Sequence, residues 1–422
     1  MSISTAKPPL AGVRVVDWTH VLAGPFASYN LALLGADVIR IERADAPDII
    51  RAAAQDPALG RLELGEAFVM QGAGKRSIAV DARDPRVRLA LERLVAGADV
   101  LLENFRPGKL ADLGFDPREL VQRHPRLVVC SISGFGQSGP LSDRPAYDHV
   151  IQAMSGIMAA NCDRQGQPMR IGLPLVDYAT GMQAALAILA ALHRRDVELQ
   201  AGTRERGEWL DVSMHGVALT LSAPAFASHA VSGIERKASR ASAFSGNPLS
   251  GTFPTAQGQV AFVCNTQAQD RAFFAFLRGL GTVAGTVDAL ERHCAARDVE
   301  AVHGLLQPLL LQRPAAEWEA LLSRAGIPAS AVRSPTQAYE QARADDRRWP
   351  AVTLDGADGR RVQVPGPGFT SDRRLVPELA APPTRGRDTR DVLREAGLDD
   401  EAIDALFADG AAVSVTREEQ PA

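Results

Sequence analysis

Asp177 is the side chain whose position in this sequence most suggests a chemical role. It follows the apolar segment 171–176, which Gly172 and Pro174 interrupt, and it precedes the long apolar run 182–192. That run predicts a buried helix. An Asp just before a helix commonly accepts hydrogen bonds from the free amides of the first turn, so a structural N-cap is the plain interpretation of Asp177. A catalytic role depends on what the rest of the chain places around it.

Further polar, cationic and glycine residues follow short apolar runs that predict strands. These groups are residues 20–25, Arg43, residues 81–83, residues 104–108 and residues 134–136. Ligands of parallel α/β sheets bind beyond the carboxyl ends of the strands, so the pattern predicts a binding edge. No G-x-G-x-x-G follows the first predicted strand, and the same spacing at 134–139 is followed by a proline rather than a helix. A dinucleotide site is therefore not predicted.

The elements that would position these residues alternate between strands and helices. Strands are predicted over 13–18, 37–43, 77–81, 99–104, 127–133 and 207–214, and helices over 26–34, 85–96, 120–124, 182–192 and 217–227. The stretch 44–74 between them is expected to be irregular. This alternation predicts an α/β protein with a Rossmann-like, doubly wound parallel sheet.

The second half of the chain predicts a smaller α+β domain. A change to Ser, Gly, Lys and Arg predicts a linker over 231–251, between a large domain at 1–230 and a small domain at 252–340. The small domain should begin with a hairpin over 252–263, followed by a helix at 268–277, a broken helical stretch over 287–311, a helix at 315–325 and a strand at 327–332. Residues 341–422 should form a return linker and a C-terminal part of the large domain. In that part we expect short strands at 352–354 and 361–365, helices at 387–396 and 399–408, and disorder over 411–422.

Bulk composition excludes several classes of protein. The chain has 422 residues, 46% of them hydrophobic, and a net charge of -4, without the basic excess of nucleic-acid or membrane-surface proteins. No signal peptide is predicted, and the apolar run 182–192 is too short to cross a bilayer. Four scattered cysteines and dispersed histidines predict neither disulfides nor a metal site, and they favour the cytoplasm.

Six segments, in their order along the chain, resemble one known family. They are 20–25 (HVLAGP), 34–39 (LGADVI), 75–78 (KRSI), 103–108 (ENFRPG), 144–148 (RPAYD) and 381–386 (APPTRG). Together they are similar to the class III coenzyme A transferases, which include formyl-CoA, carnitine and succinate–hydroxymethylglutarate CoA-transferases and the 2-methylacyl-CoA racemases. The resemblance covers nearly the whole chain. It implies a Rossmann-like large domain built from both chain ends and an interlocked, ring-like homodimer.

The same resemblance implies that Asp177 is a nucleophile. A carboxylate has an ordinary pKa of about 3.9, so we expect it to be ionised at neutral pH without a base. It could attack an acyl-CoA thioester and carry the acyl group as a mixed anhydride and then CoA as an aspartyl thioester. Coenzyme A thioesters and small carboxylic acids would be substrates, with no tightly bound cofactor. The capping and catalytic roles of Asp177 can coexist.

The matching positions for coenzyme A lie at the predicted strand ends and on one later loop. They are His20, Leu22, Ala23, Arg43, Val80, Asp81, Ala82, Arg83, Asn104, Phe105, Arg106, Pro145, Ala146, Tyr147 and Asp148. Arg43 and Arg83 suit phosphate groups, and apolar Val80 and Phe105 could flank the adenine. Leu22 and Asp112 differ from the residues of formyl-CoA transferase, and segment 246–251 lacks that enzyme's tandem-glycine loop. These differences argue against oxalate as a substrate.

Tyr147 favours transfer over racemisation. It stands where the racemases of the family carry a catalytic histidine, and a phenol with a pKa of about 10 is a poor acid–base substitute. His149 lies nearby but would point in another direction, as a packed or surface residue. The local likeness to the succinate–hydroxymethylglutarate enzyme favours succinyl-CoA or another dicarboxyl-CoA donor. A 2-methylacyl-CoA racemase, a nucleotide-dependent oxidoreductase and a non-catalytic acyl-CoA-binding protein remain alternatives.

Overall fold

The computed structural model describes residues 7–163, 165–235, 246–344, 349–354, 359–373 and 375–415. The chain divides into two compact units. The larger comprises Met1–Asn161, Pro168–Glu235 and Ala342–Ala422, and the smaller comprises Cys162–Gln167 and Arg236–Gln341. The predicted linker at 231–251 falls in part on residues 236–245, which lie outside the described ranges. The domain boundaries given above stay predictions.

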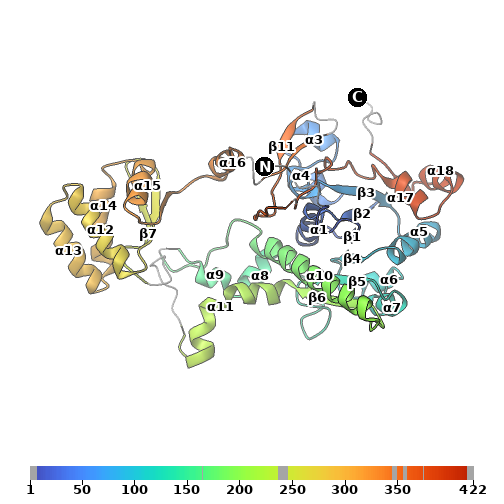
Figure 1. Ribbon diagram of the computed structural model, residues 1–422, viewed down its shortest axis with the longest axis horizontal. Helices are drawn as coiled ribbons and strands as arrows, with labels where there is room; N and C mark the ends of the chain where they lie inside the picture. The colour runs from blue at the N-terminus through green and yellow to red at the C-terminus, as the bar shows by residue number, and fades with distance from the viewer. Residues whose placement is uncertain are drawn as a thin grey trace. The chain divides into compact units, whose positions relative to one another are not determined.

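A seven-stranded sheet forms the centre of the larger unit (Figure 1). Its strands are β1 (Arg14–Trp18), β2 (Asp37–Arg43), β3 (Lys75–Val80), β4 (Val100–Glu103), β5 (Val128–Ser133), β6 (Glu208–Ser213) and β12 (Ala412–Val413). They lie in the order β12-β3-β2-β1-β4-β5-β6, and neighbouring strands are parallel except for β12 and β3. The predicted α/β class with a largely parallel sheet is confirmed.

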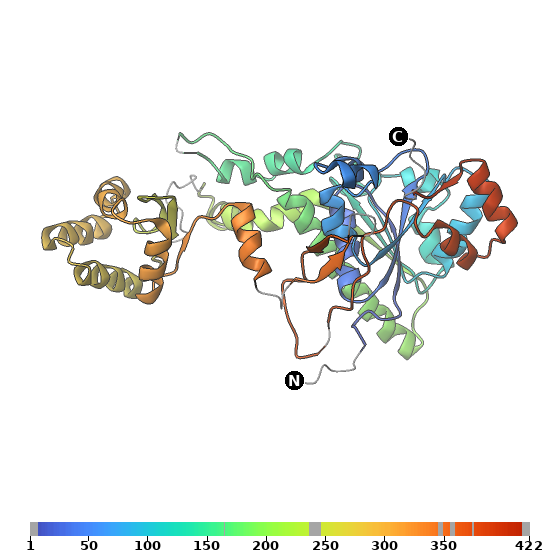
Figure 2. The same cartoon turned by 90° about the horizontal axis from the view of Figure 1, so that it is seen from above.

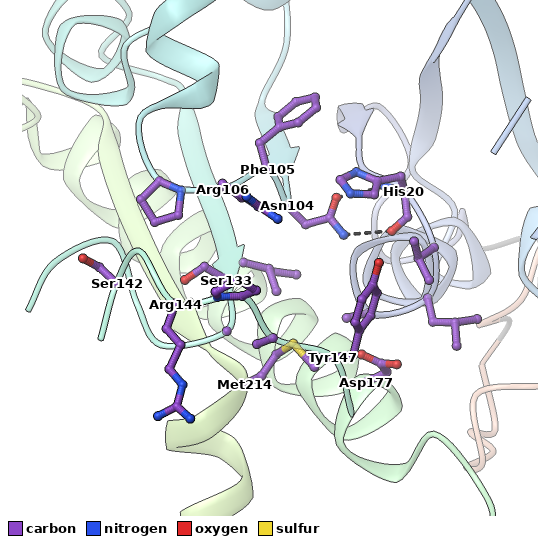
Figure 3. A pocket seen from close by; sticks show the side chains of 18 of the residues that line it. His20, Asn104, Phe105, Arg106, Ser133, Ser142, Arg144, Tyr147, Asp177 and Met214 are labelled. Atoms are coloured by element: carbon purple, nitrogen blue, oxygen red, sulfur yellow. Dashed lines mark hydrogen bonds between the residues drawn. The ribbon is translucent and has the colours of Figure 1, made fainter. Parts of the chain in front are cut away.

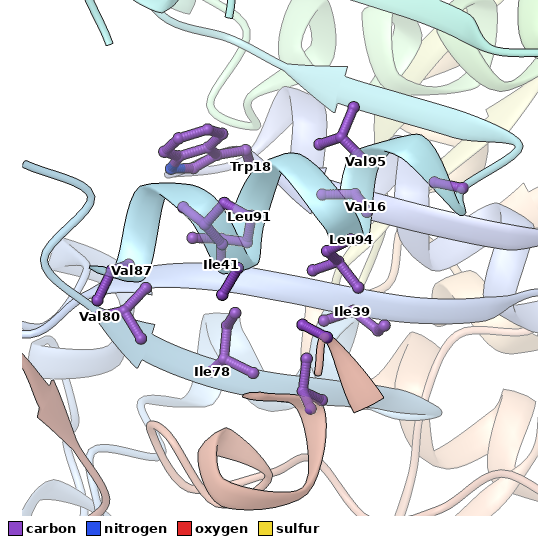
Figure 4. Close-up of a cluster of buried hydrophobic side chains, with 14 of the residues drawn as sticks. Val16, Trp18, Ile39, Ile41, Ile78, Val80, Val87, Leu91, Leu94 and Val95 are labelled. Carbon is purple, nitrogen blue, oxygen red and sulfur yellow. The ribbon is translucent and has the colours of Figure 1, made fainter. Parts of the chain in front are cut away.

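Helices cover both faces of this sheet (Figure 2). They are α1 (Ala23–Leu33), α5 (Pro85–Ala96), α6 (Lys109–Asp112), α7 (Pro117–Arg123), α10 (Leu175–Ala201), α11 (Met214–Ser232), α17 (Thr389–Glu395) and α18 (Asp400–Ala408). Helices α8 (Asp148–Met154) and α9 (Ile157–Ala160) pack with α11 in a separate cluster. On one face, apolar residues of α5 at helical spacing, such as Val87, Leu91 and Leu94, pack on the β-branched side chains of β1, β2 and β3 (Figure 4). Burying these side chains stabilises that layer.

The other face is covered by α1 and α10, which cross at close range. Gly181 makes this possible, because a Cβ there would lie 2.6 Å from the carbonyl oxygen of Ala23 in the first turn of α1. The rings of Phe26 and Tyr178 pack beside this crossing with centroids 4.4 Å apart. The crossing therefore brings the first turns of both helices to one edge of the sheet.

Helix α10 is longer than predicted. It has 27 residues, beginning at Leu175 and continuing past His193 to Ala201, so the expectation of a short helix ending near Leu192 is wrong. Among the described residues it is the one helix with the length and composition to cross a membrane. The core helix of a soluble protein meets the same test, and α10 packs its apolar residues on α1, β5 and β6.

The stretch 44–74 is ordered rather than irregular. It contains α2 (Ile49–Ala52), α3 (Pro57–Arg61) and α4 (Glu66–Gly72), and the side chains of Asp48 and Asp56 cap the first two. These helices are too short to show a helical period in the sequence. They pack with β10 (Ala351–Thr353) and β11 (Arg361–Gln363) in a separate buried cluster.

The C-terminal segment completes the sheet. The expected disorder over 411–422 is wrong for Ala412–Val413, which forms β12 against β3, whereas 416–422 lie outside the described residues. Arg385 explains the 381–386 segment. It pairs with Glu63 at 2.6 Å and donates to the carbonyls of Arg43 and Ala44, tying the chain end to the end of β2.

The smaller unit has an antiparallel sheet of β7 (Gly251–Pro254), β8 (Gln259–Phe262) and β9 (Ala329–Ala331). It also contains α12 (Gln267–Gly279), α13 (Ala284–Ala295), α14 (Val299–Leu310) and α15 (Ala315–Arg324), all packed on one apolar core. The hairpin and these helices agree with the elements expected from the sequence, and the broken stretch over 287–311 is observed as the two helices α13 and α14. Helix α16 (Pro335–Arg343), which buries no side chain, was not predicted.

Candidate active site

A pocket lies at the carboxyl ends of β1, β4 and β5, beside the first turns of α1 and α10 (Figure 3). This is the edge at which the sequence predicted a binding site. The pocket is lined by residues 20–23, 104–107, 132–134 and 142–147, by Asp177 and by Met214. A Cβ at Gly134 would lie 2.4 Å from that of Ala146, so glycine lets two lining loops meet.

Asp148 caps the helix that carries Asp177. Its Oδ2 accepts hydrogen bonds from the amide of Val176 at 2.7 Å and from that of Asp177 at 3.4 Å. Asp177 itself lies inside the first turn, after Leu175, and Pro174 at the N-cap position supplies no side-chain cap. The interpretation of Asp177 as the N-cap is therefore wrong, because a buried carboxylate from another helix satisfies those amides.

Gln152 fixes the loop before α10 and was missed in the sequence. It lies one turn after Asp148 on α8 and donates to the Asp148 carboxylate at 2.6 Å. Its Oε1 accepts from the amide of Ile171 at 2.9 Å. The spacing of four residues between two polar side chains on one short helix was the available signal.

The carboxylate of Asp177 accepts no hydrogen bond from the residues that the structure describes. Burial, and then the charge of Asp148, raise the pKa of Asp177 to about 7. The expectation of a fully ionised side chain at neutral pH therefore does not hold. A carboxylate with few hydrogen bonds is poorly solvated, and it is more reactive toward a carbonyl carbon once it is ionised.

His20 and Asn104 join two walls of the pocket. The amide of His20 donates to Asn104 Oδ1 at 2.9 Å, and Asn104 Nδ2 donates to the carbonyl of His20 at 2.8 Å. Phe105 packs its ring edge-on against Trp18 at 5.8 Å between centroids. Tyr147 is 72% exposed, so its ring is free to contact a ligand at the pocket mouth.

The structure brings ten of the predicted site residues to this pocket and leaves six outside it. Arg43 pairs with Asp45 and Arg83 with Asp81 beside the carboxyl ends of β2 and β3, and both guanidiniums are 75% exposed. These two ion pairs form a second cluster, farther along the sheet edge. Val80 is buried in the core, so its side chain cannot flank an adenine in this conformation. Ala82 packs against the same core, and the carboxylate of Asp148 is used in capping α10.

Nine of the lining residues are not among the predicted site residues, and four of them bear on the chemistry. Val21, Ser133, Arg144 and Met214 line the same space. Val21 is unusual because its φ is 65°, a left-handed conformation that β-branched residues rarely adopt. The described residues contain no cluster of His, Cys, Asp or Glu suited to a metal ion.

Comparison with known proteins decides the family. The sequence model of CoA-transferase family III matches residues 10–389. The chain belongs to this family. As a family III CoA-transferase, the protein is an enzyme whose class uses CoA thioesters as substrates, in agreement with the resemblance drawn from the six sequence segments.

Named relatives of this CoA-transferase include enzymes acting on different acids. The chain is 30% identical to succinyl-CoA:glutarate CoA-transferase from Mus musculus, over 95% of the chain and 90% of that protein. It is 37% identical to acetyl-CoA:oxalate CoA-transferase from Acetobacter aceti, over 76% of the chain and 81% of that protein. A crystal structure of a CAIB/BAIF family protein from Brucella suis superimposes with a TM-score of 0.79 at 26% identity, covering 93% of this chain and all of that one.

Proposed function

We propose that the enzyme moves CoA from an acyl-CoA donor to a free carboxylic acid through covalent intermediates on Asp177. One observation carries the proposal. A partly buried carboxylate without a hydrogen-bond partner among the described residues faces a pocket at the carboxyl edge of the sheet. Such a group is a poor structural anchor, because burying a charge without partners is costly, and a suitable nucleophile.

The reaction balances without an external base. Ionised Asp177 attacks the thioester carbonyl, the carbon–sulfur bond breaks, and CoA leaves as a thiolate, giving an acyl-aspartyl anhydride. The thiolate then attacks the aspartyl carbonyl and releases the donor acid as its carboxylate, which leaves an aspartyl-CoA thioester. The acceptor carboxylate attacks this thioester in turn, and the expelled thiolate attacks the acceptor acyl carbon of the new anhydride. Asp177 is regenerated ionised, and no proton is gained or lost.

Backbone groups at the pocket suit the charges that develop in these steps. Helix α1 begins at Ala23 with no side-chain cap on its first-turn amides, and Ala23 lines the same pocket as Asp177. Amides at a helix N-terminus stabilise an oxyanion. A site that limits water is also required, since mixed anhydrides hydrolyse readily.

The pocket and the relatives support a dicarboxylic acid as the substrate class. Arg106 and Arg144 are exposed and line the pocket, and no ion pair is seen for either of them among the described residues. A guanidinium there can pair with the distal carboxylate of a dicarboxylic acid. The relatives named for succinyl-CoA and glutarate support this choice. We take succinyl-CoA or another dicarboxyl-CoA as the donor, with the CoA phosphates near Arg43 and Arg83.

The test is a panel of donors and acceptors with the purified enzyme. Succinyl-CoA and acetyl-CoA are each combined with glutarate, oxalate and succinate, and new thioesters are identified by mass spectrometry. Hydroxylamine should modify Asp177 only when a donor is present, and Asp177→Asn should abolish transfer. Turnover by that variant, or trapping at another residue, contradicts the proposal. Exchange of an α-proton with deuterium in the absence of any acceptor would indicate a racemase instead.

We also propose a homodimer located in the cytoplasm. Apolar side chains of α10 and α11 remain exposed in the single chain, with Met182 at 54% and Leu186 at 58%, and Phe226 at 42%. An exposed apolar face of this kind is typical of a subunit interface. Light scattering coupled to size-exclusion chromatography gives the mass in solution, and a monomer at micromolar concentration contradicts the dimer. The free cysteines fit a reducing compartment.

A further inference from the structure

Val21 forms a strained turn in the wall of the pocket. Its φ of 65° is unfavourable for a β-branched residue, which normally avoids the left-handed region. Its side chain nevertheless packs against the buried cluster around α2 and α4. Strain of this kind persists only where the surrounding structure fixes it, and it concentrates at functional sites.

Side chains from three other parts of the chain hold the peptide groups on both sides of Val21. The amide of Val21 donates to Asp48 Oδ2 at 2.9 Å, and Gln71 Nε2 donates to the carbonyl of Val21 at 3.1 Å. The preceding residue, His20, is held by Asn104 through both its amide and its carbonyl. Both sides of the left-handed residue are therefore clamped.

The side chains that hold Val21 are themselves buried and costly to place. Asp48 also caps α2 through the amide of Ile50 and receives a hydrogen bond at 2.6 Å from Arg40, which is 1% exposed. Gln71 is fully buried, and its Oε1 has no hydrogen-bond partner in the described part of the chain. Burying an unsatisfied acceptor destabilises a fold, so the bond from Gln71 to Val21 serves something other than stability.

The turn decides where helix α1 begins. Leu22 and Ala23 follow it directly, and their positions line the pocket with Asp177. A return of Val21 to a negative φ would swing the uncapped first-turn amides of α1 away from that position, because the chain direction changes at this residue. The helices α2 and α4 of segment 44–74 thus act as a brace for the pocket.

We propose that Gln71 and Asp48 are positioning residues of the transfer reaction, which hold Val21 left-handed so that the N-terminus of α1 faces the carbonyl attacked by Asp177. This inference rests on the proposed function. Neither side chain lines the pocket, so both act through the backbone of Val21.

The experiment is a double-mutant cycle between Gln71 and Val21. Gln71→Leu keeps the side-chain volume and removes the donated bond, and it should lower kcat at least tenfold with little change in KM for the donor. Val21→Gly adopts the same φ without strain, so loss of Gln71 in that background should lower kcat less than threefold. The assays use succinyl-CoA with glutarate, or the fastest pair from the panel above.

Tyr29→Phe is the matched control. Tyr29 is buried in the same cluster and donates to the carbonyl of Pro365 at 2.6 Å, away from the pocket. Its removal should lower the Tm and leave kcat unchanged. If Gln71→Leu does not fold, Gln71→Met replaces it in the cycle.

Two results overturn the inference. One is a wild-type kcat for Gln71→Leu, and the other is an equal loss of kcat on removing Gln71 whether Val21 is intact or already replaced by glycine. Failure of the proposed function looks different, because Asp177→Asn would then remain active whatever residue stands at 71.

Discussion

At the scale of single residues, the surroundings of Asp177 favour its reactivity and lower the stability of the folded protein. Burial and the charge of Asp148 both disfavour the ionised form of the side chain that the reaction needs. The helix dipole at the start of α10 acts in the opposite sense. The balance leaves Asp177 titrating close to neutral pH.

The first prediction concerns the pH dependence of activity. Because the pKa of Asp177 is raised to about 7, kcat/KM should rise with pH through a midpoint near 7 and then level off. Asp148→Asn keeps an acceptor for the amide of Val176 and removes a charge, so it should move the midpoint to lower pH. Stopped assays from about pH 5.5 to about pH 8.5 measure both profiles. A flat profile for the wild type would show that the ionisation of Asp177 does not limit the reaction.

The second prediction concerns stability. A folded-state pKa above the unfolded value of about 3.9 means that the folded protein binds more protons between about pH 4 and 7, so the contribution of Asp177 to stability falls as pH rises through this window. Asp177→Asn cannot ionise and should increase the free energy of unfolding at about pH 8 by about 1 kcal/mol, a value reduced for partial exposure. At about pH 4.5 the gain should nearly vanish.

Urea unfolding at the two pH values measures this difference. The exposed Asp112, changed to Asn, serves as the control and should show no pH-dependent gain. An equal effect of Asp177→Asn at both pH values would contradict the raised pKa.

The sequence could identify Asp177 but not its surroundings. Asp177 stood out because Gly172 and Pro174 break the chain before an apolar helix. The capping by Asp148 depends on a contact between residues 29 positions apart, and the clamp of Val21 depends on Gln71, 50 positions away. No local pattern encodes such contacts, and the φ of a valine cannot be read from its neighbours.

At the scale of elements, the crossing of α1 and α10 sets the geometry of the site. Gly181 lies one turn after Asp177 on α10, where the helix meets the backbone of α1. Any side chain there would separate the nucleophile from the N-terminus of α1.

The third prediction is that Gly181→Ala reduces both stability and activity. Its Cβ would lie 2.6 Å from a carbonyl oxygen and 3.1 Å from a backbone nitrogen, so a helix must shift, at a cost of roughly 1–3 kcal/mol. We expect kcat to fall at least tenfold, as measured with the best substrate pair. Gly304→Ala on α14 is the control. Nothing lies within 4 Å of that position, and alanine should stabilise the helix by up to about 1 kcal/mol. Similar behaviour of the two variants would contradict the close crossing.

Helices and strands were predicted correctly where apolar residues recur at one clear spacing. Helix α5 was predicted with its observed bounds, because Val87, Leu91 and Leu94 mark a clear apolar face between a Pro start and a Gly end. The short helices of segment 44–74 were not predicted, because one or two turns are too short to show a repeating pattern of apolar residues. Helix α10 was cut short at His193 because its later turns are polar, although they continue the same helix.

At the scale of the whole molecule, the two ends of the chain depend on one another. Arg385 is the central link, with Glu63 and two carbonyl groups as partners, and Arg51 adds another by donating to the carbonyl of Pro383. The resemblance implied a large domain built from both chain ends, but the contacts that join the two ends could not be predicted from the sequence.

The fourth prediction is that Arg385→Leu destabilises the protein by about 2–3 kcal/mol, because it leaves Glu63 and two carbonyls without a partner. Arg394→Leu is the matched control on the same segment. Its partners Asp391 and Asp400 are exposed, so its loss should cost no more than about 0.5 kcal/mol. Thermal unfolding followed by circular dichroism measures both, and equal Tm values for the two variants would rule out the link.

The pairing of β12 with β3 has a consequence for biosynthesis. Val80 leaves the ribosome long before its partner Ala412, a delay of roughly 20 to 70 seconds at about 5–20 residues per second. Throughout that interval the nascent chain carries an open strand edge that could recruit other chains. The sheet is therefore completed only after translation, and the yield of folded protein in a cell depends on how well the open edge is kept from pairing with other chains until then.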